Sequence, residues 1–404
     1  MSKTVAIIAE YNPFHNGHKY HIDKIREEFG EDATVIAIMS GNYTQRAEVA
    51  FADKLLRASA AVDCGVNLVL ELPFPFSSSS AELFASAGVS IADNLGVVDY
   101  LSFGSEDGNC DNLYTIANNM LSSRFKTALS SAQNEKAFDS IGFASLAEAI
   151  YKNCFSYEGE SFTTPNNILA LEYMKALIKC KSKIEPHTVK RIGASYNDEK
   201  LTDSTFQSAT AIRGSINHND FSAFDFMPNS AKKLYISALN AAEIPCNYEK
   251  LSSAFISFFR LNSASANKIH DAEGGLYKRL VNLSFKTNSI SSLTELAATK
   301  KYTLARIRRA ILFSFFGVTS SDVKTEPCYT QVLAMDSVGA KILKEIKKKG
   351  RISIITKPSA TKTLDSVASH QKALSDAADS VFQLTKPGET SGCYHMTFTP
   401  YIRS

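Results

Sequence analysis

The sequence lacks the features that define several specialised classes of protein. No apolar run reaches the ~18 residues of a membrane span, and the apolar segment at residues 5–9 is too short for a signal-peptide core, so we expect a cytoplasmic protein with no membrane partner. The seven cysteines form no CxxC pair, and their odd number argues against a disulfide framework and a structural zinc site. A net charge of +3 excludes a uniformly basic nucleic-acid binder, so any such contact must come from local patches.

The composition is that of a globular protein with more than one domain. The chain has 404 residues, of which 44% are hydrophobic and 21% are charged. In its first half, continuous apolar segments alternate with amphipathic ones, as in a parallel sheet whose strands are buried on both faces. We therefore predict an α/β fold with a Rossmann-like parallel sheet. The predicted strands are residues 4–11, 33–41, 66–74 and 98–106, and the predicted helices are 17–29, 53–64 and 165–179.

A domain boundary is predicted where the segment "DFMPNS" interrupts this alternation. We place a first domain at residues 1–225 and a mostly helical second domain at residues 226–404. The tail of the second domain contains one candidate strand, "RISIIT".

The stretch "AEYNPFHNGHKYHI" carries three histidines at the end of the first predicted strand. His15 and His18 flank the expected helix N-terminus, where free N–H groups and the helix dipole favour an anion such as phosphate. Pro13 fixes the turn, and Gly17 allows a flat ligand to approach the backbone. A zinc site that includes His21 is an alternative, but no HExxH motif or cysteine partner accompanies it. Solvated histidines at a helix start are a third interpretation.

The segment "NPFHNGH" resembles the HxGH signature of the HIGH-type nucleotidyltransferase superfamily, whose histidines contact the phosphates of ATP. Over most of its length the chain resembles the bacterial tRNA(Met) cytidine acetate ligases, through seven collinear blocks. These are "EYNPFHNGH", "MSGNYTQRAE", "DCGVNLVLELPF", "FGSEDG", "PNNILALEY", "KRIGASYND" and "SATAIR". Many enzymes of the superfamily carry an aspartate where this chain has Asn12.

The resemblance implies that the first domain is a nucleotidyltransferase-like catalytic domain that binds ATP, with His15 and His18 as its catalytic residues. The ATP-binding residues that it implies are Ile7, Ile8, Ala9, Glu10, Tyr11, Asn12, Pro13, Phe14, His15, Asn16, Gly17, His18, Lys19, Tyr20, Gly104, Asn166, Arg191 and Ile192. From the residues alone, plainer interpretations also stand: Gly104 as a turn glycine, Asn166 as a helix cap and Arg191 as a surface charge.

Two further segments are candidates for the same site. "SATAIR" resembles a late signature of the superfamily near the leaving phosphates, with Ser208, Thr210 and Arg213 as candidate phosphate contacts; a serine helix cap beside a solvated arginine is the plainer interpretation. The loop after the second strand could shape an acceptor or acid pocket through Ser40, Asn42, Gln45 and Arg46. On the following helix, Lys54 and Arg57 are predicted to form a solvated face.

A basic segment in the second domain is the candidate tRNA-binding surface. In "KKYTLARIRRAILFSFFG", Leu304, Ile307, Ile311 and Phe315 recur at helical spacing, and Arg306 and Arg309 are expected roughly opposite them. The candidate tRNA-binding residues are Lys300, Lys301, Arg306, Arg308 and Arg309. A merely solvated helix is equally compatible with this spacing. A second cluster at residues 341–351 is more simply explained as cations at a helix C-terminus.

The implied activity is that of an ATP-dependent ligase. Acetate and ATP would give acetyl-adenylate, and the acetyl group would pass to the wobble cytidine of elongator tRNA(Met). ATP is then a substrate, Mg²⁺ is expected with its phosphates, and no zinc is expected. Two alternatives remain open: a small-molecule adenylyltransferase of the same superfamily, and an RNA-binding protein whose nucleotide fold has lost activity. The oligomeric state does not follow from the sequence.

Overall fold

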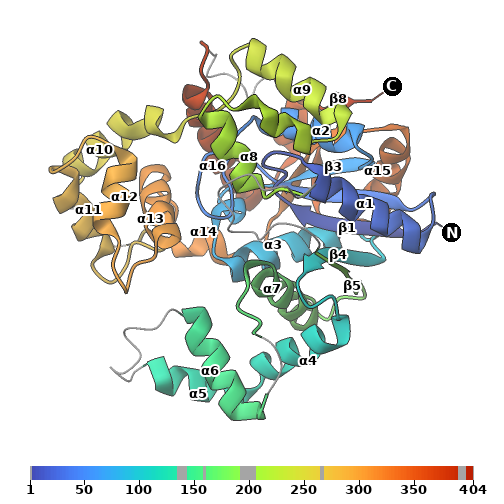
Figure 1. Ribbon diagram of the computed structural model, residues 1–404, viewed down its shortest axis with the longest axis horizontal. Coiled ribbons are helices and arrows are strands. Elements are labelled where there is room, and N and C mark those ends of the chain that lie inside the picture. The colour runs from blue at the N-terminus through green and yellow to red at the C-terminus, as the bar shows by residue number, and fades with distance from the viewer. Residues whose placement is uncertain are drawn as a thin grey trace.

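The computed structural model describes residues 2–133, 143–157, 161–191, 206–263, 268–389 and 397–403. Its centre is one sheet in the order β5-β4-β1-β2-β3-β6-β7, with β8 paired to β6 (Figure 1). The strands from β5 to β3 run parallel, which confirms the predicted parallel sheet. The strands are β1 (Thr4–Ala9), β2 (Thr34–Ser40), β3 (Leu68–Leu72), β4 (Tyr100–Ser105), β5 (Glu185–Lys190), β6 (Tyr329–Met335), β7 (Ser353–Ile355) and β8 (Tyr401–Ile402).

Helices cover both faces of this sheet and form a separate lobe beside it. They are α1 (Asn16–Phe29), α2 (Lys54–Asp63), α3 (Ala81–Asn94), α4 (Cys110–Leu121), α5 (Ser123–Gln133), α6 (Phe143–Phe155), α7 (Pro165–Cys180), α8 (Ala209–Asn217), α9 (Asn229–Asn240), α10 (Ser252–Leu261), α11 (Leu276–Ser284), α12 (Ile290–Ala297), α13 (Leu304–Phe316), α14 (Ser320–Lys324), α15 (Ser337–Lys349) and α16 (Ser366–Phe382). None of the helices in these described ranges has the length and apolar character needed to cross a membrane.

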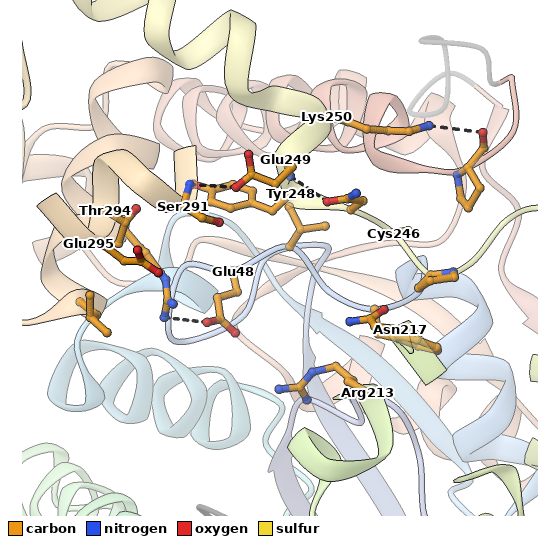
Figure 2. Close-up of a pocket in the computed structure, with 17 residues that line it drawn as sticks. Glu48, Arg213, Asn217, Cys246, Tyr248, Glu249, Lys250, Ser291, Thr294 and Glu295 are labelled. Atoms are coloured by element: carbon orange, nitrogen blue, oxygen red, sulfur yellow. Dashed lines mark hydrogen bonds and ion pairs between the residues drawn. The ribbon is translucent and has the colours of Figure 1, made fainter. Parts of the chain in front are cut away.

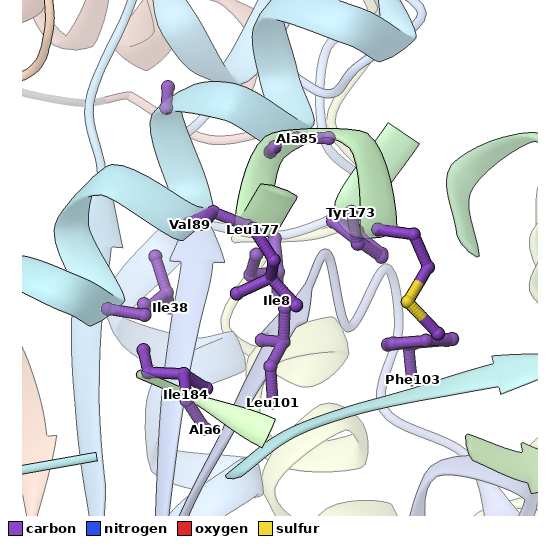
Figure 3. Packing of buried hydrophobic residues seen from close by; sticks show 14 of the residues in the cluster. Ala6, Ile8, Ile38, Ala85, Val89, Leu101, Phe103, Tyr173, Leu177 and Ile184 are labelled. Atoms are coloured by element: carbon purple, nitrogen blue, oxygen red, sulfur yellow. The ribbon is translucent and has the colours of Figure 1, made fainter. Parts of the chain in front are cut away.

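Strands β1, β2 and β3 are buried on both faces because alternate side chains enter two different cores. Ile8 and Ile38 pack with α3 and α7 on one face (Figure 3), whereas Ile7 and Ala37 pack with α1 and α2 on the other. Side chains alternate along a strand, so a strand covered on both faces is apolar at most of its positions. This explains why continuous apolar runs predicted these strands correctly.

Helices α10 to α13 pack around a third core in a lobe beside the sheet (Figure 1). Phe255 and Phe259 of α10 meet Ile307 and Ile311 of α13 there, and all four side chains are buried. The lobe also contacts the loop after β2, because Tyr43 belongs to the same core. The helical lobe is therefore fixed against the end of the sheet from which the loop after β2 emerges.

The end of the chain returns to the sheet. Strand β6 pairs antiparallel with β3, and β7 and β8 both pair with β6. The predicted strand "RISIIT" is confirmed as β7, whereas β5, β6 and β8 had not been predicted. Glycine is required where α15 approaches the sheet, since a Cβ on Gly339 would lie only 1.9 Å from the carbonyl oxygen of Asn67. The domain division at residue 225 stays a prediction, and strands β6, β7 and β8 extend the sheet that the first domain begins.

Candidate active site

The histidine turn connects β1 to α1 and caps that helix with its own imidazoles. Helix α1 begins at Asn16, one residue before the predicted start at Gly17, and His15 is its N-cap in extended conformation. Nδ1 of His15 accepts from the Gly17 N–H at 3.1 Å, and Nδ1 of His18 accepts from the His15 N–H at 3.2 Å. A neutral imidazole that accepts through Nδ1 carries its proton on Nε2. Both histidines therefore have an N–H donor left for a ligand.

These two histidines are neutral in the free protein. Burial, reinforced by the charges of Arg191 and Arg213, lowers the pKa of His15 to about 3. Burial, together with His15, His21 and Arg191, holds the pKa of His18 well below its usual range. Neutral donors surrounded by guanidinium groups favour an anion without adding charge of their own, which agrees with the predicted phosphate site.

Arg213 fastens helix α8 to the histidine turn. Its Nη1 donates to the Asn12 carbonyl at 2.6 Å, and its Nη2 donates to Thr210 Oγ1 at 3.2 Å. The plainer interpretation of Ser208 is confirmed, because its hydroxyl caps α8 by accepting from the Ala211 N–H at 3.0 Å. The expectation of a solvated arginine is wrong for Arg213, which holds the turn in place.

The buried side chain of Asn12, at the start of the histidine turn, has a structural task. Its side-chain oxygen accepts from the Phe51 N–H at 2.7 Å, and the side chain is buried. The turn is thus tied to the loop before α2 as well as to α8. The amide provides the acceptor for this bond without burying a negative charge beside the candidate phosphate site.

The three later candidates lie around the ends of β4 and β5. Gly104 pairs with Val189, and a Cβ there would lie 3.6 Å from Cγ of Arg191. The Arg191 guanidinium is near enough to the histidine turn to lower the pKa of His15 and of His18, and its contact with phosphate stays a prediction. Ile192 lies outside the described residues.

Asn166 is not the cap of α7. The N-cap is Thr164, and Asn166 Nδ2 donates to Glu106 Oε1 at 2.7 Å. Glu106 also accepts from Thr164 Oγ1 at 2.8 Å and from the Asn167 N–H at 2.9 Å. Sequence reasoning missed Glu106 as the anchor of this helix start, although it belongs to the quoted block "FGSEDG".

The prediction of a solvated face for Lys54 and Arg57 is wrong, because both side chains are buried. Arg57 donates to the carbonyl oxygens of Glu10 at 2.6 Å, Ser40 at 3.2 Å and Gly41. It therefore joins the ends of β1 and β2 through backbone acceptors. The i, i+3 spacing showed that Lys54 and Arg57 share a face, and the fold turns that face towards the sheet.

Lys54 is the centre of a buried charge network that includes the C-terminal part of the chain. Its ammonium lies 2.7 Å from Glu71 and 2.5 Å from Asp379 of α16. Burial alone would lower the pKa of Lys54, but the two nearby carboxylates raise it above its usual value. For Glu71 and Asp379 the balance is different: burial raises the pKa of both carboxyls, and the charge of Lys54 only partly opposes this. Asn42 joins the network, accepting from the Lys54 N–H and donating to Asp379, both at 2.8 Å.

The other candidate residues of the loop after β2 differ in their contacts and in their burial. The Gln45 N–H donates to Glu10 Oε1 at 2.7 Å, while burial raises the pKa of that carboxyl. Ser40 is buried and Arg46 is exposed. Gln45 is therefore adjacent to the histidine turn, and a pocket for the acid or acceptor at this loop stays a prediction.

The basic helix α13 is less available for RNA than its sequence indicates. Arg309 is buried and forms an ion pair with Asp271. The same carboxylate lies 3.8 Å from Arg306. Arg308 forms a separate ion pair with Glu48 at 2.6 Å. The expected position of Arg309 on the outer face is therefore wrong. Leu304, expected on the apolar face, is 44% exposed. Lys300 and Lys301 are exposed, and no ion pair is found for either with the residues that the structure describes.

The zinc alternative gains no support from the described part of the chain. No group of three potential ligands among histidine, cysteine, aspartate and glutamate comes together there. His21 instead lies 2.7 Å from the Ser102 hydroxyl, and burial with the charge of His187 lowers its pKa to about 4.

Comparison with known proteins identifies the chain at two levels. It belongs to the HIGH Nucleotidyl Transferase family, which matches residues 2–394. Within that class it is a member of the tRNA(Met) cytidine acetate ligase family and hence a ligase. A protein of that name from Thermoanaerobacter sp. (strain X514) is 38% identical over 365 residues, covering 89% of both chains. Another from Clostridium perfringens is 36% identical over 368 residues, covering 88% of this chain and 90% of that one.

Solved structures agree with this assignment. The apo crystal structure of Thermotoga maritima TmcAL matches with a TM-score of 0.92 at 30% identity and covers 99% of both chains. A second form of that protein, bound with alpha-thio ATP, matches with a TM-score of 0.90 at 30% identity over 100% of both chains. These likenesses support the same α/β nucleotidyltransferase fold along the whole chain.

Proposed function

We propose that this protein activates acetate with ATP and transfers the acetyl group to the wobble cytidine of elongator tRNA(Met), forming 4-acetylcytidine. The observation that carries the proposal is the histidine turn, with two neutral Nε2–H donors at a helix N-terminus between Arg191 and Arg213. The names of the relatives, and the ATP analogue bound to the Thermotoga protein, support the choice of substrates.

In the first step an acetate oxygen attacks the α-phosphorus of ATP, and pyrophosphate leaves. A carboxylate at neutral pH is already ionised and needs no general base, so the site must orient the reactants and stabilise the charge that develops on the phosphates. His15 and His18 donate to these oxygens in this proposal. Arg213 is oriented towards the turn by its bond to Asn12 and adds positive charge near the leaving group.

In the second step the exocyclic amine of cytosine attacks the acetyl carbon, AMP leaves with the bonding electrons, and the nitrogen releases one proton to give the amide. The lone pair of this amine is conjugated with the ring, which makes it a poor nucleophile. A mixed anhydride is therefore needed as acyl donor, and orientation of the two substrates is the main contribution of the protein.

Mg²⁺ would enter as the complex with ATP. Its usual ligands are oxygens of the phosphates, water and one or two carboxylates. Glu10 is the acid nearest in sequence to the histidine turn, and its carboxyl already accepts from the Gln45 N–H. The residues present fit a cation held mainly by the nucleotide and water.

The tRNA is proposed to bind the helical lobe. Residues 248–324 contain twelve lysines and arginines against five aspartates and glutamates, within a chain whose total charge is only +3. A local excess of this kind attracts phosphates and makes affinity depend on salt. Lys300 and Lys301 are the best-placed candidates, since both are exposed.

The test is an incubation with ATP, labelled acetate and a tRNA pool, followed by nucleoside analysis of the labelled product. Label in 4-acetylcytidine from tRNA(Met) is expected. Pyrophosphate exchange that depends on a mononucleotide instead of acetate would indicate the small-molecule adenylyltransferase, and ATP binding without any turnover would indicate the inactive RNA-binding protein.

A further inference from the structure

A cleft separates the catalytic side of the sheet from the helical lobe. Its volume is about 780 Å³, and pockets of roughly 300–1,000 Å³ hold ligands of nucleotide size. Figure 2 shows Arg213 and Asn217 on one wall and Tyr248, Glu249 and Thr294 on the opposite wall. The two walls therefore come from the two halves of the chain that the proposed reaction must bring together.

The floor of the cleft is in direct contact with the histidine turn. Arg213 and Phe51 both line the cleft, and both bind Asn12, one at its carbonyl and the other at its side-chain oxygen. A ligand in the cleft would thus contact Arg213 and Phe51, the two residues that bind Asn12 in the turn to which we assign the ATP phosphates. A second substrate is expected to approach from this side.

One ion pair on the wall of the cleft presents donors and acceptors that complement the hydrogen-bonding edge of cytosine. Arg308 of α13 and Glu48 lie 2.6 Å apart, with side chains 27% and 35% exposed. Together they present guanidinium donors beside carboxylate acceptors. The free edge of cytosine presents the complement: an amino group that donates and two atoms, N3 and O2, that accept.

An aromatic side chain lies on the same wall. Tyr248 lines the cleft, and its buried hydroxyl has no hydrogen-bond partner among the described residues. Aromatic rings in such positions stack on bases that are turned out of an RNA loop. The cleft therefore combines a stacking surface, donors and acceptors in one space.

We propose that this cleft is the pocket for the acceptor nucleoside, turned out of the RNA loop. Glu48 accepts from the exocyclic amine of cytosine, Arg308 donates to N3 or O2, and Tyr248 provides the stacking surface. The inference rests on the proposed function and adds to it the place and the residues that select the base.

Photocrosslinking tests the location of the base. An anticodon stem-loop with 5-iodocytidine at the wobble position is irradiated with the full-length protein, and the crosslinked peptide is identified by mass spectrometry. A crosslink at Tyr248 or another residue of the cleft is expected, and it should be lost in Tyr248→Leu. A crosslink confined to peptides away from the cleft would overturn the proposal.

Base selection tests the roles of Glu48 and Arg308. Glu48→Gln replaces an acceptor with a group that can also donate to the O4 of uridine, so the preference for stem-loops with wobble cytidine over wobble uridine should fall about tenfold or more. Arg308→Gln should lower kcat/KM for tRNA about ten- to a hundredfold. Lys179→Gln, which breaks the exposed pair with Glu82, is the matched control and should change neither value.

The outcomes separate this inference from the proposed function. If the wild-type protein acetylates tRNA(Met) and both cleft variants keep wild-type efficiency and base preference, the cleft is not the acceptor pocket. If the wild-type protein shows neither acetate-dependent pyrophosphate exchange nor acetylation, the proposed function itself fails. The melting temperature of each variant is measured as well, so that activities are compared only among variants that are folded.

Discussion

The imidazole rings of His15 and His18 are stacked, with their centroids 3.8 Å apart and their planes 29° from parallel. This arrangement follows from the capping box, in which each ring accepts a backbone N–H at the start of α1. Each histidine therefore has two separable roles: Nδ1 stabilises the helix start, and Nε2–H is free to donate to a ligand.

Substitutions that keep the cap and remove the donor should separate these roles. Asparagine is among the best N-cap residues, and glutamine is a normal partner at the third helical position. We expect His15→Asn and His18→Gln to keep the wild-type melting temperature, while acetate-dependent pyrophosphate exchange falls roughly 10²–10³-fold for each. Exchange at the wild-type rate in both variants would remove the histidines from the chemistry.

His21 should make the protein less stable in acid. Its pKa is about 4 in the folded protein, because of burial first and then of the His187 charge, against about 6.5 in an unfolded chain. Between these values the unfolded chain binds more protons, so the free energy of unfolding decreases as pH falls from 6.5 to 4, by up to ~1.4 kcal/mol per unit.

The comparison that isolates this effect is denaturant unfolding of wild type and His21→Gln at several pH values. The variant should show a shallower dependence between pH 6.5 and 4. Carboxyls with raised pKa, such as Glu71, act in the opposite direction but are common to both proteins. Parallel curves would contradict the assignment of a neutral, buried His21.

Lys54→Met should leave Glu71 and Asp379 buried without their cation. Removing one partner of a buried ion pair typically costs about 3–5 kcal/mol of unfolding free energy. Because the folded protein then takes up a proton more readily than the unfolded chain, the deficit relative to wild type should narrow as pH falls from 7 to 5. Lys348→Met, which removes an exposed pair with Glu345, is the control and should cost less than ~1 kcal/mol.

Charge reversal in the helical lobe should affect tRNA binding where the side chain is exposed and stability where the side chain is buried. Lys300→Glu with Lys301→Glu should leave the melting temperature unchanged, weaken tRNA binding and reduce the salt slope by about 0.7–0.9 per lost phosphate contact. Arg309→Glu should instead destabilise the lobe, because it places two carboxylates together at Asp271. If the lysine variant keeps its affinity and slope, the cluster at residues 341–351 becomes the next candidate.

The sequence predicted those parts of the structure that depend on local pattern. Strands β1 to β3 have continuous apolar runs because both of their faces are covered, and the start of α1 at Asn16 lies one residue from the predicted start at Gly17. The position of the histidine turn between a strand and a helix could be predicted for the same reason, and the phosphate site inferred from that position stays a prediction.

The features that the sequence did not predict depend on contacts between distant residues. Arg309 is adjacent to no acid in sequence, and its partner Asp271 comes from a different helical connection of the lobe. Lys54 and Arg57 form a buried face because the ends of the strands provide carbonyl and carboxylate acceptors. Strand β6 could not be assigned to the sheet because its partner β3 precedes it by more than 250 residues.

That long separation between β3 and β6 has a consequence for synthesis on the ribosome. The hydrogen-bonding edge of β3 has no neighbour until Tyr329–Met335 has left the exit tunnel. At roughly 5–20 residues per second, this edge stays open for tens of seconds on each nascent chain. An unpaired edge strand is a template for association with other chains, so the nascent chain is open to such association until β6 pairs with β3.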